Sequence, residues 1–148
     1  MKHITRVLFF TVLAIVLSSC EKAEYVLEFG QELKGYVTEQ EWEEIHITEG
    51  SWVTTACYLY SEDSKRWIKT NLSGWVGFPV HSYNFSPDGI VNSSSSHYEW
   101  RFNASDSSLT IGIASYKVID FEVDKLYLYE SDDHGATPKI LLLLRKAQ

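Results

Sequence analysis

Long hydrophobic runs are missing from this sequence, apart from one near its start. Residues 7–17, VLFFTVLAIVL, form a run of eleven without a charge, whereas a helix that spans a membrane needs about twenty apolar residues. Lys2, His3 and Arg6 precede the run. A short basic start before a short apolar run is typical of an export signal, so the sequence predicts a cleaved leader and no spanning helix.

Cysteine is equally scarce, since Cys20 and Cys57 are the two in 148 residues. LSSC, residues 17–20, follows the apolar run and resembles the bacterial lipobox, in which an aliphatic and two small residues precede a diacylated cysteine that begins the mature chain. The resemblance implies a signal peptide at residues 1–19, lipidation of Cys20, and a bacterial envelope protein anchored to a membrane, facing the periplasm or the cell exterior. An ordinary secretory signal with an incidental cysteine is the alternative.

A lipidated Cys20 would leave Cys57 without a partner in the chain, so no intramolecular disulfide is expected. Two acyl chains hold a protein to a membrane far more durably than one. Cys57 lies within TTACYLY. We expect it to be a small buried hydrophobic residue and not a reactive thiol.

Basic residues are few. Removing residues 1–19 takes away two of the 13 bases and none of the 20 acids, so the net charge changes from −7 to −9. Nucleic acid and anionic lipid headgroups are poor partners for such a surface. The remaining length fits one domain, and nothing repeats at a fixed period.

Catalytic motifs are also absent: the chain has no Gly-x-Ser-x-Gly, no glycine-rich phosphate loop, no His-Glu-x-x-His and no Cys-x-x-Cys. A metal site from His81 and His97 is conceivable, but chance placement explains them better. Asp120, Glu122 and Asp124 alternate and could pair as acid and base, although a solvated strand face is the default. We therefore predict neither an enzyme nor a cofactor.

Residues 20–35 are polar with scattered apolar positions, and we interpret them as a lipidated tether that precedes a domain at residues 36–148. Thr38 and Glu41 fit a capping box. Trp42 follows at helical spacing, which predicts a short amphipathic helix over about residues 39–47, with a strand as the rival interpretation. The Glu41, Glu43 and Glu44 cluster fits a solvated helix face.

From Gly50 onward the pattern has period two, with turn signals every ten or so residues, which predicts half-buried antiparallel strands. The expected core positions are Trp100, Phe102, Leu109, Ile111, Ile113, Ile119, Phe121, Leu126 and Leu128, with Glu99, Arg101, Asp120 and Glu122 facing water. We predict strands near 51–60, 66–70, 74–85, 89–93, 97–103, 108–114, 115–123, 125–130 and 139–145. A meander of eight or nine strands usually closes into a barrel to remove its edges.

The last strand departs from alternation, because residues 140–144 are all apolar. A strand that is apolar on both sides needs cover on both sides. The segment around Trp42 is the unassigned element able to cover the outer side, so we expect the helix to pack outside the barrel.

Together these features resemble the lipocalin-like domains of small bacterial lipoproteins. The resemblance spans residues 50–146 and depends on the order of its motifs, which are GSW at 50–52, YNFSPDG at 83–89, Tyr98-x-Trp100, LTI at 109–111, YKVIDFEVDKLYL at 116–128 and a last strand ending in Arg145-Lys146. It departs from the family in the insert WIKTNLSGWVGFP and in a helix placed before the barrel. The family encloses small apolar molecules in the barrel mouth, so the resemblance implies a ligand-binding module.

Aromatic residues are plentiful: five tryptophans, nine tyrosines and seven phenylalanines. Filling the core is their ordinary role. The alternative is that Trp67, Trp75, Phe78 and Tyr83, in and around the insert, line or cover an open barrel end and bind a small apolar or amphipathic ligand.

In lipocalins the tryptophan of Gly-x-Trp plugs the closed end, under an arginine from the end of the final strand. Trp52 and Arg145 match those positions, and antiparallel pairing of the first and last strands would bring them together. We expect the Arg145 guanidinium within about 6 Å of the Trp52 ring; a solvated Arg145 is the alternative. The leading function is a membrane-anchored ligand-binding module, and the second is an interaction protein whose filled barrel docks on an envelope partner.

Overall fold

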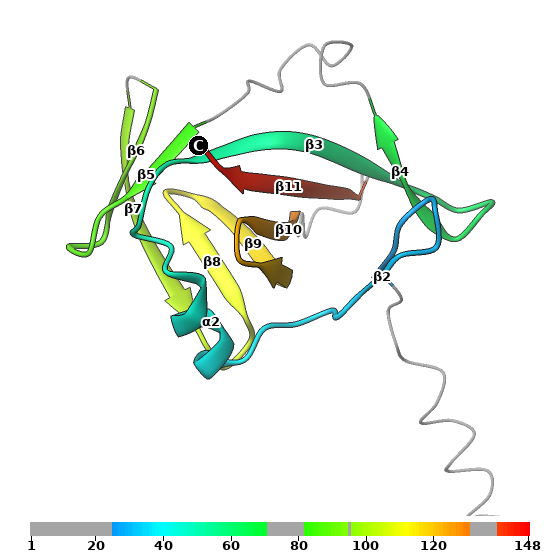
Figure 1. Ribbon diagram of the computed structural model, residues 1–148, viewed down its shortest axis with the longest axis horizontal. Coiled ribbons are helices and arrows are strands. Elements are labelled where there is room, and N and C mark those ends of the chain that lie inside the picture. The colour runs from blue at the N-terminus through cyan, green and yellow to red at the C-terminus, as the bar shows by residue number, and fades with distance from the viewer. Residues whose placement is uncertain (1–24, 71–81, 95, 131–138) are drawn as a thin grey trace, which may run out of the picture.

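The computed structural model describes residues 25–70, 82–94, 96–130 and 139–148, which are mostly antiparallel β-structure (Figure 1). Its one helix in this part of the chain is α2, Glu39–Ile45. The strands are β1 (Tyr25–Val26), β2 (Glu32–Leu33), β3 (Trp52–Ser61), β4 (Arg66–Thr70), β5 (Ser82–Phe85), β6 (Ile90–Ser93), β7 (Ser96–Asn103), β8 (Ser108–Ile111), β9 (Ala114–Glu122), β10 (Lys125–Glu130) and β11 (Ile140–Lys146). Most of these bounds confirm the predicted strands; of the strand expected at 74–85, residues 71–81 lie outside the described residues.

The strands of the main sheet ring round, because its first and last members pair with each other. The order is β11-β10-β9-β8-β7-β6-β5-β3-β4, and β11 also pairs with β3. β5 pairs with the start of β3 and β4 with its end. The all-β prediction is confirmed, and every neighbouring pair in the sheet is antiparallel.

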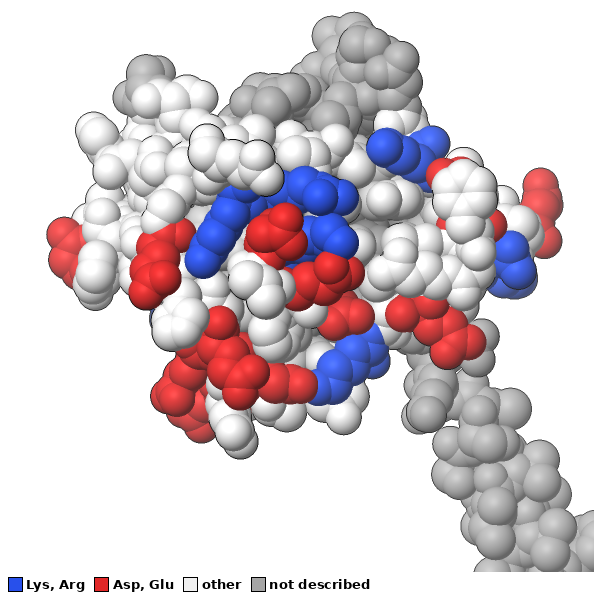
Figure 2. Space-filling view, in the orientation of Figure 1, with Lys and Arg blue, Asp and Glu red and all other residues white. Residues whose placement is uncertain are grey.

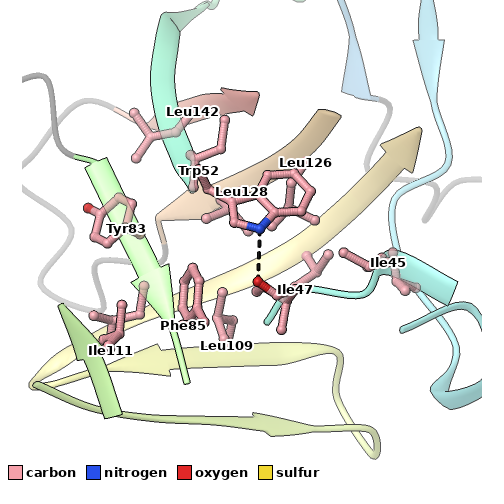
Figure 3. Close-up of a cluster of buried hydrophobic side chains, with 14 of the residues drawn as sticks. Ile45, Ile47, Trp52, Tyr83, Phe85, Leu109, Ile111, Leu126, Leu128 and Leu142 are labelled. Carbon is pink, nitrogen blue, oxygen red and sulfur yellow. Dashed lines mark hydrogen bonds between the residues drawn. The ribbon is translucent and has the colours of Figure 1, made fainter. Parts of the chain in front are cut away.

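Side chains from all round the ring fill its interior (Figure 3). Trp52 is fully buried, and its Nε1–H donates to the carbonyl oxygen of Ile47 at 2.9 Å. Around it packs a group that we call the inner cluster: Val37, Ile45, Ile47, Trp52, Cys57, Tyr83, Phe85, Val91, Leu109, Ile111, Val118, Leu126, Leu128, Ile140, Leu142 and Leu144. In the part of the chain that the structure describes, the interior of the ring is therefore a packed core.

A second group of apolar side chains lies on the opposite face of β3, β9, β10 and β11. We call it the outer cluster: Leu27, Leu33, Ala56, Tyr58, Trp67, Ile119, Tyr127, Leu141 and Leu143. β1 pairs with β2, and this hairpin supplies Leu27 and Leu33. The outer side of the last strand is thus covered as expected, but by the hairpin and not by the helix.

Two predictions about the N-terminal part were wrong for this reason. The described end of the expected tether, from Tyr25 on, is a hairpin packed on the sheet. The helix does not cover the outside of β11, because its Ile45 belongs to the inner cluster and Trp42 packs against that cluster. The capping box itself is confirmed, since the Thr38 side chain accepts from the Glu41 N–H and the Glu41 carboxylate accepts from the Thr38 N–H.

A bulge moves one predicted core residue to the other face. β10 pairs Tyr127 with Asp120 and Leu128 with Val118, so Ile119 is an extra residue in β9. Ile119 is buried, but in the outer cluster. Phe121, Trp100 and Phe102 pack against the inner cluster as expected, although they are only partly buried.

Ile113 is the clear failure among the predicted core positions, because it is fully exposed. β8 ends at Ile111, and Gly112 adopts a positive φ of 59° in the turn to β9. An added Cβ on Gly112 would stand 3.0 Å from Cδ1 of Tyr98. The turn therefore ends the alternation one residue before Ile113.

Lys146, and not the predicted Arg145, lies over Trp52. The register pairs Arg145 with Val53 and Lys146 with Trp52. Successive side chains of a strand point to opposite faces, so Lys146 shares the face of Trp52. Its Nζ lies 5.2 Å from the indole centroid, which is within cation–π range. The expected pairing of the first and last strands is present, but its register places Lys146, the residue after Arg145, over Trp52.

Candidate functional site

A groove of about 660 Å³ lies between α2, the β5–β6 turn and the end of β7. Its lining residues come from three elements: Glu39, Trp42, Glu43, Pro87, Gly89, Trp100, Arg101, Phe102, Asn103 and Ala104. Ligand sites usually have volumes of about 300–1,000 Å³. This groove is therefore large enough for a small molecule.

The groove exists because β7 is longer than its neighbour β6. β6 pairs with β7 only as far as Glu99, and the Trp100 N–H then donates to the Gly89 carbonyl at 2.8 Å. Beyond that point β7 continues to Asn103 and pairs with β8 alone. The helix α2 lies across this end of β7, where β6 no longer covers it (Figure 1).

The β5–β6 turn forms the wall facing the helix. Pro87 and Gly89 belong to the turn, where the Gly89 N–H donates to the Ser86 carbonyl at 3.1 Å and Gly89 has a φ of 86°. Glycine adopts this left-handed conformation without steric cost. The turn is tied to β7 a second time, because the Trp100 Nε1–H donates to the Ser86 carbonyl at 3.0 Å.

Aromatic rings hold the helix wall against the strand. Trp42 stacks on Phe102 with ring centroids 4.0 Å apart and an interplanar angle of 10°. Trp100 meets Phe85 edge to face at 5.4 Å. Trp42, Trp100 and Phe102 are all partly exposed and line the groove. The groove thus has an aromatic surface whose rings are fixed by packing.

The charged groups of the groove are divided between its walls. Glu39 and Glu43 lie on α2 and Arg101 on β7, and all three are exposed. Glu41, on the same helix, is neutralised by an ion pair with Lys34. Hydrogen bonds from Lys34 and from the Thr38 N–H lower the pKa of Glu41 to about 2. Figure 2 shows acidic side chains gathered where α2 lies.

Of the four residues predicted to bind a ligand, the structure describes two, and they lie on opposite faces of the sheet. Trp67 is buried in the outer cluster, where it stacks on Tyr25 at 5.9 Å. Tyr83 is buried in the inner cluster. These two therefore do not line one cavity, while Trp75 and Phe78 lie outside the described residues.

Tyr83 belongs to a group of ionisable side chains in the ring interior. Burial, and next the charge of Glu130, raise the pKa of Tyr83 to about 12 and that of the Cys57 thiol to about 11. Tyr116, opposite Glu130 in the register, has its pKa raised mainly by burial. A buried thiol with this pKa stays protonated at neutral pH, so Cys57 fits the expected small hydrophobe and lacks the thiolate of a nucleophile.

Two other candidate groups have ordinary structural roles. Asp120 is half-buried and accepts from the Lys34 N–H at 3.0 Å, which attaches the segment after the hairpin to β9. Glu122 is exposed and paired with Lys125. His97 hydrogen-bonds with Asn92, and His81 lies outside the described residues. Among the described residues no three His, Cys, Asp or Glu side chains gather in a way that could hold a metal ion.

The groove was not predicted from the sequence, although part of its signal was present. Glu39, Trp42 and Glu43 have the spacing of one helix face, and Trp100 and Phe102 alternate on one strand face. Nothing in those patterns shows that the two faces meet. The charged side chains of the lining are two carboxylates, Glu39 and Glu43, and one guanidinium, Arg101.

A comparison with protein-family models matches none of them, and a search of curated proteins finds no match to the chain. In the part of the chain that the structure describes, no helix is long and apolar enough to cross a bilayer.

Proposed function

We propose that this chain is a lipid-anchored, non-enzymatic binding protein of the bacterial envelope, with a lipocalin-like barrel that takes a small amphipathic ligand. The observation that carries the proposal is the groove of about 660 Å³ with aromatic side chains in its surface and charged groups at its edges. An apolar surface with a few placed polar groups is the usual composition of a small-molecule site.

The packed interior supports a site in the groove and not at the centre of the ring. Trp52, Val91, Leu109 and Val118 have no exposed surface. The pairing of β11 with β3 leaves β4 outside the ring, which therefore has eight strands. A ring of eight strands is just wide enough for side chains or for one small ligand. Here side chains take that room, whereas the groove is open to solvent.

A lipid anchor would place the domain near a source of amphipathic molecules. Tyr25, the first described residue, is five positions after Cys20. Five extended residues reach at most about 18 Å. The hairpin would therefore stay close to the membrane surface, and the domain could take a ligand from it.

The experiment compares two neighbouring substitutions on α2. Glu43 lines the groove and Glu44 does not, and both are exposed. Glu43→Trp should fill part of the groove, while Glu44→Trp adds the same indole to the solvent side. Each variant and the wild type are purified from the native host and the extracted small molecules identified by mass spectrometry. We expect one compound in wild type and Glu44→Trp that is strongly depleted in Glu43→Trp. Equal amounts in all three, or none in any, would contradict the proposal.

A second candidate function is an interaction module, and an exposed apolar pair favours it. Ile113 is fully exposed and Tyr98, packed against Gly112, is 44% exposed. A partner covering this pair should be lost from crosslinked cells on Ile113→Asp. Val123→Asp is the matched control, because Val123 is also an exposed aliphatic residue in a turn.

A further inference from the structure

The two groove carboxylates repel each other and find no cation among the described residues. Glu39 and Glu43 are four positions apart on α2, and like charges at that spacing repel each other. The ion pairs among the described residues include neither of them, while the nearby Lys34 pairs with Glu41. The helix also has no basic residue in its last turn. This wall of the groove therefore carries two carboxylates that have no ion-pair partner among the described residues.

Aromatic rings line the same groove as the two carboxylates. Trp42 lies between Glu39 and Glu43 in the sequence and lines the same groove. A cation over the face of a tryptophan is attracted by the ring, and quaternary ammonium groups are recognised in this way. Such a group is weakly hydrated compared with an ordinary charge and can contact a ring and a carboxylate together.

We propose that the groove selects amphipathic ligands that carry an ammonium group, with the cation held by Glu39 and Glu43 beside the exposed part of Trp42 and the apolar part against the exposed parts of Trp100 and Phe102. This inference rests on the proposed function and names the ligand class of that site. Arg101, on the β7 wall, would repel a cation, which sets the orientation of the ligand with its head at α2. The volume of about 660 Å³ admits a headgroup and a stretch of tail.

The test uses probes with the same twelve-carbon tail and different heads. Dodecyltrimethylammonium, dodecyl maltoside and dodecanoate are titrated below their critical micelle concentrations into the mature chain with Cys20→Ser, by calorimetry. We expect the trimethylammonium probe to bind about tenfold more tightly than the maltoside and the dodecanoate to bind most weakly. Choline, which has the head without the tail, should bind at least about tenfold more weakly than dodecyltrimethylammonium, because the aromatic surface then goes unused.

Matched variants connect the preference to the two carboxylates. Glu39→Gln with Glu43→Gln should weaken binding of the trimethylammonium probe by about three- to tenfold and leave that of the maltoside unchanged, since exposed ion pairs contribute modestly. Glu44→Gln is the control, because it removes a charge from the same helix outside the groove. Arg101→Gln should strengthen binding of the trimethylammonium probe.

The outcomes separate this inference from the function on which it rests. Equal affinity for the trimethylammonium and maltoside probes, or equal losses in the Glu44→Gln and double variants, would overturn the ammonium preference while the groove still binds. Choline that binds as tightly as the tailed probe would overturn the amphipathic part of the assignment. If none of the tailed probes binds, the proposed function fails as well.

Discussion

Replacing Trp52 by phenylalanine tests how the structure joins α2 to the sheet. The indole is fully buried, and its Nε1–H donates at 2.9 Å to the carbonyl of Ile47, just after the helix. Phenylalanine keeps an aromatic ring but has no donor. The Ile47 carbonyl would be left in a buried place without that partner (Figure 3).

The expected loss follows from two contributions. A buried carbonyl that loses its donor costs about 1–3 kcal/mol. The smaller ring also leaves a void, which adds about 1 kcal/mol. A cation–π contact with Lys146, which has its Nζ 5.2 Å from the ring, persists in part over phenylalanine. We therefore expect Trp52→Phe to lower the free energy of unfolding by about 2–4 kcal/mol.

Trp100→Phe is the matched control, because Trp100 makes the same kind of bond. Its Nε1–H donates to the Ser86 carbonyl at 3.0 Å, but the side chain is only partly buried. Water can replace a donor at such a place, so the loss should be under about 1 kcal/mol. Urea unfolding of the mature chain with Cys20→Ser, followed by circular dichroism, measures both. Equal losses in the two variants, or under about 1 kcal/mol for Trp52→Phe, would refute the reasoning.

Four further predictions concern single groups. Thr38→Ala should cost about 1 kcal/mol in the same urea assay through loss of the capping box, and an unchanged midpoint would contradict this. Because the pKa of Glu41 is lowered to about 2, its stabilising effect is complete above about pH 4.5 and is lost as the pH falls toward 2; the stability difference between wild type and Glu41→Gln should shrink over that range, and a constant difference would count against it. Cys57, with its pKa raised to about 11, should react with iodoacetamide at pH 8 only when urea unfolds the chain with Cys20→Ser, so rapid labelling of the folded protein would be inconsistent with its burial. Cys20→Ser itself should keep the fold and release the protein from membranes in cell fractionation, whereas unchanged sedimentation would mean that something other than acylation retains it.

Local patterns in the sequence predicted the elements well where each residue's neighbours decide its structure. The capping box at Thr38 and Glu41 depends on a spacing of three residues, and it forms as expected. The strand predicted at 125–130 has those bounds, with Leu126 and Leu128 inside. Period-two alternation suffices where a strand is regular and one side is buried.

The period-two pattern gave wrong predictions where the strands are irregular. A bulge adds one residue without changing composition, so Ile119 moved to the outer cluster unforeseen. A second bulge, at Thr55 in β3, lies between Thr54 and Ala56 and interrupts the period-two alternation in the same way. The hairpin of β1 and β2 has strands of two residues each, too short for any periodic signal. Its burial depends on the outer face of β11, which is distant in sequence.

The candidate site was predicted least well because it depends on tertiary contacts. The aromatic character of Trp42, Trp100 and Phe102 was visible in the sequence. Their meeting was not, since it requires β7 to extend beyond β6 and the helix to lie across the end of β7. Trp67 was among the aromatic residues assigned to an open barrel end, but it is buried in the outer cluster.

The indole N–H resonances of the tryptophans test the central claim most directly, because each reports on one place in the molecule. Trp42 and Trp100 line the groove, whereas Trp52 and Trp67 are buried in the inner and outer clusters. Two-dimensional NMR of the ¹⁵N-labelled mature chain with Cys20→Ser is recorded during titration with dodecyltrimethylammonium and, separately, dodecyl maltoside, with resonances assigned by single substitutions. A ligand in the groove should shift the Trp42 and Trp100 signals saturably and leave those of Trp52 and Trp67 in place. Saturable shifts confined to other tryptophans, or none with either probe, would contradict the groove as the binding site.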